Sequence, residues 1–77
     1  MEPIEELRAK AAAHRRLPPP EQRRAVRHAA GVPLADVARA VGCSTAAVCR
    51  WERGSRTPRG WRLERYLATL VAMGGAQ

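Results

Sequence analysis

The side chains best suited to chemistry in this sequence are arginines, and many of them lie in its second half. Arg50 and Arg53 are close together, and residues 55–66 add four more arginines against one acid, Glu64. A guanidinium is permanently charged, and its planar donors match phosphate oxygens and the edge of guanine. The pattern predicts a polyanionic partner, above all a nucleic acid.

Other groupings that support chemistry are missing from the sequence. Cys43 and Cys49 are six residues apart, and neither His14 nor His28 stands at metal-ligand spacing from them. We interpret the two cysteines as reduced thiols that pack as small, mostly apolar side chains. There is no carboxylate pair, activated nucleophile or phosphate loop, so we expect no catalytic residues, no cofactor and no metal site.

Composition narrows the class of protein further. The 77 residues carry 14 basic and 7 acidic side chains, a net charge of +7, which fits one small domain with an anionic partner. A GC-rich genome would also favour arginine, so the placement of the charges has to decide. No apolar run approaches the roughly 18 residues of a membrane span, and the acidic start is unlike a signal peptide. We expect a soluble, cytoplasmic protein with no membrane contact.

Helix start and stop signals divide the chain into five helical segments. Prolines separate the first two segments, and Gly31 and Gly42 are natural left-handed caps for the ends of the second and third. Ser44 is a good N-cap for the fourth segment. The expected helices cover about residues 2–16, 21–30, 34–41, 45–53 and 61–73, which makes an all-α protein.

The first segment has a thin apolar stripe of Ile4, Leu7 and Ala11, too small to hold a core by itself. Three prolines then interrupt the chain. We therefore predict an appended helical arm with a proline-rich connection at residues 1–19 and a main domain at residues 20–77. The arm is expected to pack on its own body or on a partner.

Two short helices joined by a tight turn stand at the centre of the main domain. In the first of them, Leu34, Val37, Ala38 and Val41 repeat at helical spacing and form a buried stripe. Only Cys43 and Ser44 separate Gly42 from the next helix. This arrangement predicts a helix-turn-helix.

The helix at 45–53 has a core side and an unusually small outer side. Ala47, Val48 and Trp51 share the inward face. Small outward residues would let the helix backbone approach base edges in a major groove about 12 Å wide. A plain alanine-rich surface helix is the alternative, but the turn, the cap and the charge together favour entry into the groove. The outward residues are Thr45, Ala46, Cys49, Arg50 and Arg53.

The stretch "LADVARAVGCSTAAVCRWERGSRTP" resembles the helix-turn-helix of the lambda-repressor and Cro-like (XRE-type) regulators of bacteria and phages. Ala38, Gly42, Val48 and the "WERGSRTP" that follows carry the likeness, which covers about residues 20–73. The resemblance implies a small five-helix bundle. It also implies that the start of the recognition helix and the residue before its tryptophan read bases, here Ser44, Thr45, Ala46 and Arg50.

The same resemblance implies further roles. Glu52 after the tryptophan is expected to form a structural ion pair with Arg27. At the start of the scanning helix this chain has Pro33 and Leu34 where the family often has Ser-Gln, so the usual phosphate contact of that glutamine needs a replacement. The expected phosphate-binding residues are Arg53, Arg56 and Arg59 beyond the recognition helix, and Arg23 and Arg24 at the start of the second helix. Arg62 and Arg65 fit a solvated surface equally well.

In role, a small Cro-like transcriptional repressor of phage, prophage or bacterial origin agrees best with these features. The partner would be double-stranded DNA with a palindromic operator, bound by a homodimer that forms at least on DNA. The apolar face of the last helix would close the core over Trp51 and could also join two protomers. The alternative is a protein-interaction module, such as an antitoxin or adaptor, built on the same fold.

Overall fold

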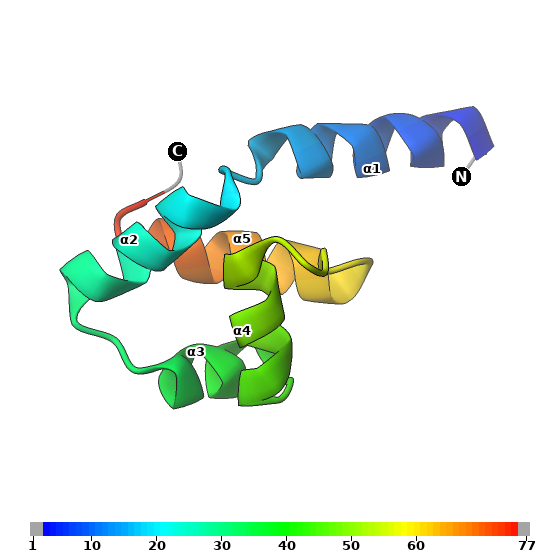
Figure 1. The fold of residues 1–77 in the computed structure, drawn as a ribbon. Coiled ribbons are helices and arrows are strands. Elements are labelled where there is room, and N and C mark those ends of the chain that lie inside the picture. The colour runs from blue at the N-terminus through cyan, green and yellow to red at the C-terminus, as the bar shows by residue number, and fades with distance from the viewer. Residues whose placement is uncertain (1–2, 76–77) are drawn as a thin grey trace.

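The computed structural model describes residues 3–75, which form helices joined by short loops (Figure 1). The all-α prediction is confirmed, and the three central helices begin and end within one residue of their expected bounds. The helices are α1 (Pro3–Arg16), α2 (Pro20–Ala30), α3 (Leu34–Val41), α4 (Thr45–Arg53) and α5 (Trp61–Ala72).

The turn between α3 and α4 depends on a glycine and a serine. Gly42 has a φ of 89°, a left-handed conformation that other residues rarely adopt, and its N–H donates to the Ala38 carbonyl oxygen over 2.8 Å. The Ser44 hydroxyl then accepts a hydrogen bond from the Ala47 N–H over 3.1 Å, which satisfies one of the open donors at the start of α4. The predicted helix-turn-helix is therefore formed by local contacts within a few residues.

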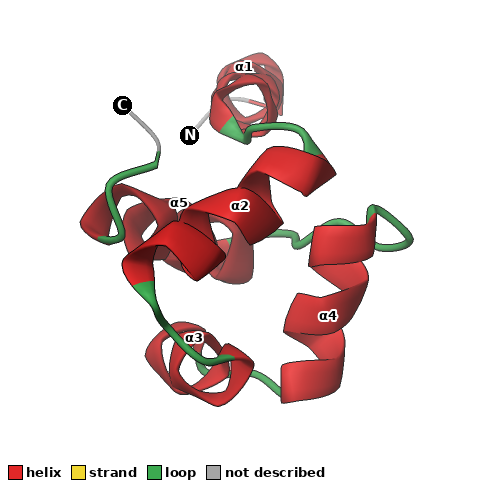
Figure 2. Ribbon diagram, turned by 60° about the vertical axis from the view of Figure 1, so that its left-hand side comes forward, coloured by secondary structure: helices red, strands yellow, loops and turns green. Residues whose placement is uncertain are grey.

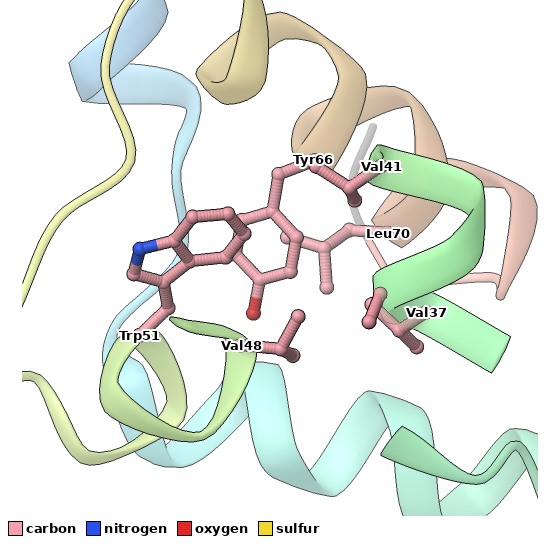
Figure 3. Packing of buried hydrophobic residues seen from close by; sticks show 7 residues of the cluster. Val37, Val41, Val48, Trp51, Tyr66 and Leu70 are labelled. Carbon is pink, nitrogen blue, oxygen red and sulfur yellow. The ribbon is translucent and has the colours of Figure 1, made fainter. Parts of the chain in front are cut away.

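The main core lies where α3, α4 and α5 meet (Figure 3). Trp51 is only 4% exposed and Tyr66 only 1%, and their ring centroids are 4.9 Å apart with the planes tilted by 50°. Such tilted aromatic pairs stabilise a core beyond the area they bury. The predicted inward orientation of Trp51 and Val48 is confirmed. The buried members of this core are Val37, Ala38, Val41, Val48, Trp51, Tyr66 and Leu70.

A second, smaller apolar cluster attaches α1 to the body. Ala13 of α1 packs with Leu63 and Leu67 of α5, and Leu17 lies against both clusters. The other end of α1 extends away from the remaining helices (Figure 1), and Ile4 and Leu7 there are 63% and 65% exposed. The arm therefore packs on its own body through its last turn, while its apolar stripe faces outward.

Two side chains of α5 have surroundings that the sequence does not predict. Val71 is 45% exposed, so the buried face of α5 is narrower than the run of apolar residues suggests. Arg65 donates from Nε and Nη2 to the Ala40 carbonyl oxygen over 3.2 and 2.8 Å. It thus satisfies an open carbonyl at the end of α3. Arg65 has a structural role.

We expect the free energy of unfolding to fall as pH rises from about 10 to about 12. Burial, and secondarily the charge of Glu52, raises the pKa of Tyr66 from 10.0 to about 12. Between these values the unfolded chain has lost the phenolic proton while the folded chain keeps it. The free energy of unfolding should therefore fall by roughly 2–3 kcal/mol across this pH range. Denaturant unfolding at several pH values would measure the loss.

The matched variant for this measurement is Tyr66→Phe, which keeps the ring. Because Tyr66 is the single tyrosine, tyrosinate absorbance follows its ionisation directly. Burial also raises the pKa of Cys43 from 9.0, so a loss of stability that begins near pH 9 and persists in the variant comes from this thiol. An unchanged slope in Tyr66→Phe would contradict the assignment to Tyr66.

Candidate nucleic-acid interface

Helix α4 stands at the edge of the molecule, with α3 packed on one side and open space on the other (Figure 2). Ser44, Thr45, Ala46 and Arg50 are all exposed, as the expected base-reading residues should be. The first turn presents only small side chains outward, so its backbone can approach a surface closely. Arg50 is the first long side chain on this face. Cys49, which was expected to face outward, is half-buried.

A hollow of about 480 Å³ lies between α4 and the segment that leads into α5. Its lining includes the apolar residues Ala47, Trp51 and Pro58, and Cys43, Ser44 and Thr57 add polar atoms. Within the described residues no carboxylate lines it, so a negatively charged group could enter without repulsion. The cations around it are Arg50, Arg56, Arg59 and Arg62.

The loop after α4 is tied to the end of that helix. The Arg50 carbonyl oxygen accepts hydrogen bonds from the Ser55 N–H, the Ser55 hydroxyl and the Arg56 N–H, over 3.1, 3.3 and 3.4 Å. Gly54 has a φ of 75°, and a Cβ there would lie 2.9 Å from Pro20 Cγ, so only glycine lets the loop pass α2. The loop therefore holds Arg56 at a fixed place beside α4.

A second hollow lies on the other side of α4, against α2. Arg24 and Arg53 stand there together with His28, and two carboxylates, Glu21 and Glu52, are also among the lining residues. Helix α4 is thus flanked by hollows that carry arginines on both sides. Two phosphate backbones border the major groove of duplex DNA, so arginines on both sides of α4 suit a helix inserted between them.

Arg23 has a different role from the one expected. It is 7% exposed, and it donates from Nε to the Pro18 carbonyl oxygen over 2.7 Å and from Nη1 to the Trp51 carbonyl oxygen over 2.8 Å. Burial lowers the pKa of this guanidinium, against the opposing effects of Tyr66 and Glu21. Arg23 links the start of α2 to the end of α4, and the prediction that it contacts phosphate is wrong.

The ion pair between Arg27 and Glu52 is present. Arg27 Nε lies 2.6 Å from Glu52 Oε2, and Arg27 Nη2 donates to Glu52 Oε1 over 3.0 Å. The side chains are only 12% and 6% exposed, and Arg27 Nη1 also donates to the Val32 carbonyl oxygen over 3.1 Å. The hydrogen bond to Glu52 raises the pKa of Arg27. This pair joins α2 to α4 from the inside and leaves the outer face of α4 unobstructed.

Sequence reasoning had a signal that would have separated Arg23 from the surface arginines. Arg23 and Arg27 are four residues apart and therefore share one face of α2. Since Arg27 was expected to pair with a residue of α4, Arg23 should have been assigned to the same inward face. Arg24, one position further, is exposed. The sequence does not assign a role to Arg62, because only the loop geometry brings it to the first hollow.

Comparison with known proteins agrees with this geometry. Residues 21–77 match a family model described as a helix-turn-helix domain, which belongs to the XRE/Cro-like clan. The match covers α2 to α5 and leaves α1 outside it. Searches of curated proteins and of solved structures find no match.

None of the helices in residues 3–75 has the length and apolar character needed to cross a membrane.

Proposed function

Because the chain belongs to the helix-turn-helix domain family, and so binds DNA, we propose that it is a sequence-specific transcriptional repressor of the Cro-like type. Its origin would be a phage, a prophage or a bacterial host, and it would act in the cytoplasm by covering promoter DNA. The exposed face of α4 carries this proposal. Its first turn presents small residues, Arg50 follows them, and a hollow lined by arginines lies on each side of the helix.

In the proposed complex, α4 lies in the major groove. Ser44, Thr45 and Ala46 approach base edges with the first turn, and Arg50 donates to a guanine. The surrounding arginines contact phosphates on both sides of the groove and fix the position of the helix. The proposed phosphate contacts are Arg24, Arg53, Arg56 and Arg59.

The first test of this function is the salt dependence of binding to duplex DNA. Each phosphate contact releases condensed counterions, so log affinity should fall with log salt with a slope of about −0.9 per contact. With several arginines in contact, we expect a steep line in a fluorescence anisotropy titration. A flat line for specific duplex would exclude the proposed interface.

Arg50→Ala and Arg56→Ala should have different effects. Loss of a bidentate guanine contact costs about 1–3 kcal/mol and relaxes the preference at one base pair of each half-site. We expect that result for Arg50→Ala. Arg56→Ala should weaken all sequences by a similar factor and make the salt slope shallower by about 0.9. Competition between a selected site and random duplex measures both effects.

These two substitutions control each other, because both remove one exposed arginine. If Arg50→Ala weakens selected and random duplex equally, Arg50 contacts only phosphate, and sequence is read by Ser44, Thr45 or the shape of the DNA. If neither variant changes DNA binding while the fold is intact, the proposed interface is wrong.

Binding as a homodimer to a palindromic operator is also part of the proposal. One copy of α4 reads a short half-site, and a two-fold pair of chains reads both halves of a palindrome, about one helical turn apart. Selection of bound sequences from random duplex DNA would give the site, its symmetry and the half-site spacing. A site without symmetry would contradict the dimer.

One observation favours the alternative function as a protein adaptor. Ile4 and Leu7 form an exposed apolar stripe on α1, outside the part of the chain that matches the family. Exposed apolar stripes on helices often dock partner proteins. If the protein acts through α1, Leu7→Asp should abolish its biological activity in vivo. The affinity of this variant for duplex DNA should equal that of the parent protein.

A further inference from the structure

The hollow between α4 and α5 contains one arginine to which the proposed function assigns no role. Arg62 is the second residue of α5 and lines the hollow together with Arg50, Arg56 and Arg59. Its guanidinium carbon lies 4.9 Å from the centroid of the Trp61 ring. In residues 3–75 no carboxylate forms an ion pair with Arg62. Its donors remain available to an anion that enters the hollow.

The Trp61 ring is itself held against the helix-turn-helix. A Cβ on Gly42 would lie 3.7 Å from two atoms of the Trp61 ring, an ordinary contact distance, so the ring lies beside the turn. The rest of the side chain is open to solvent, with 56% of the residue exposed. A cation over such a ring is attracted to its π face, and an arginine can stack on it without losing its in-plane donors.

Arg62 also lies close to the start of α4. The charge of Arg62 opposes the effect of burial on the pKa of Cys43, the residue that precedes the N-cap Ser44. Ser44 and Arg62 line the same hollow, so the N-cap hydroxyl of α4 and the guanidinium of Arg62 are both near an anion that enters it.

We propose that this hollow is a phosphate-binding site in which Arg62 contacts the phosphate and Trp61 is the residue that positions Arg62. A volume of about 480 Å³ also suits a ligand of nucleotide size, whose ring would contact the apolar lining residues Ala47, Trp51 and Pro58. The phosphate can therefore belong to the DNA backbone, or to a free phosphorylated ligand that competes with DNA. The first source rests on the proposed DNA binding, and the second does not.

The DNA source is tested with Arg62→Gln, Trp61→Leu and the double variant in duplex titrations at several salt concentrations. Arg62→Gln should lower the affinity for all sequences several-fold and make the salt slope shallower by about 0.9. Trp61→Leu should weaken binding less. In the Arg62→Gln background Trp61→Leu should have no further effect, because a positioning residue acts only through its partner.

The matched control is Arg8→Gln, which removes an exposed arginine from α1, away from the hollow. If Arg62→Gln changes the DNA affinity and slope no more than Arg8→Gln does, DNA phosphate is not the ligand. Thermal unfolding of each variant shows whether the domain is intact. If Trp61→Leu does not fold, the comparison of Arg62→Gln with Arg8→Gln decides alone.

The free-ligand source is tested with inorganic phosphate and adenosine monophosphate, titrated without DNA at constant ionic strength and followed by NMR shifts. Saturable shifts around the hollow that disappear in Arg62→Gln, together with competition against duplex, would support a free ligand. The proposal is overturned if neither ligand causes NMR shifts and Arg62→Gln changes DNA binding no more than Arg8→Gln does. A parent protein that binds no duplex would remove the proposed function and leave this test of the hollow valid.

Discussion

Trp51→Ala should lower the free energy of unfolding by about 3–5 kcal/mol, the usual range for a buried tryptophan truncated to alanine. The side chain is 4% exposed and packs on Tyr66 with ring centroids 4.9 Å apart. Small domains have a total stability of roughly 5–15 kcal/mol, so this loss is a large share of the total. Chemical denaturation followed by circular dichroism measures the difference.

Trp61→Ala is the matched control, because it removes the same side chain from a site that is 56% exposed. Its effect on stability should be a small fraction of that of Trp51→Ala. Equal unfolding midpoints for the parent protein and Trp51→Ala would mean that Trp51 is not in the core. The orientation of α4 proposed for DNA binding would then be wrong as well.

Arg27→Met should also be strongly destabilising, by about 3–5 kcal/mol, because it leaves the Glu52 carboxylate buried without its partner. Glu52 is 6% exposed in its side chain and receives both of its short contacts from Arg27. The hydrogen bond from Arg27 to the Val32 carbonyl oxygen is lost at the same time. The unfolding free energy from denaturant titration is the quantity to compare.

Two further variants separate the buried charge from other causes. The double variant Arg27→Met with Glu52→Leu should recover a large part of the loss, since neither member of this pair then stays buried without the other. Arg39→Met removes the arginine of a surface pair with Asp36, whose side chains are 79% and 53% exposed, and should change stability little. If the double variant is less stable than Arg27→Met alone, the unpaired carboxylate is not the cause of the loss.

The helices could be predicted because single residues fix their ends. Gly42 needs a left-handed backbone, and Ser44 caps the next helix with its hydroxyl, so the turn is a local property that the residue types reveal. The inward position of Trp51 followed from helical spacing with Val48 in the same way. Helix ends and side-chain orientations could be predicted wherever the contacting residues are close in the sequence.

The arginines were harder to assign, because every one of them is compatible with a surface. Arg23 donates to the carbonyl oxygen of Trp51 and Arg65 to that of Ala40, and both contacts join residues more than 20 positions apart. The loop from Gly54 to Gly60 follows a path set by Pro20 and the buried Pro58. That path decides which arginines share a hollow, and no local pattern specifies it.

The division of the apolar residues into two clusters has a consequence for how the protein opens. Helix α1 is attached through Ala13 and Leu17 against Leu63 and Leu67, and its first turns bury almost nothing. A helix of 14 residues is marginal by itself in water. Amide hydrogen exchange should therefore divide the chain into two cooperative units, with α1 exchanging by its own low-energy opening and the helices around Trp51 exchanging only through global unfolding.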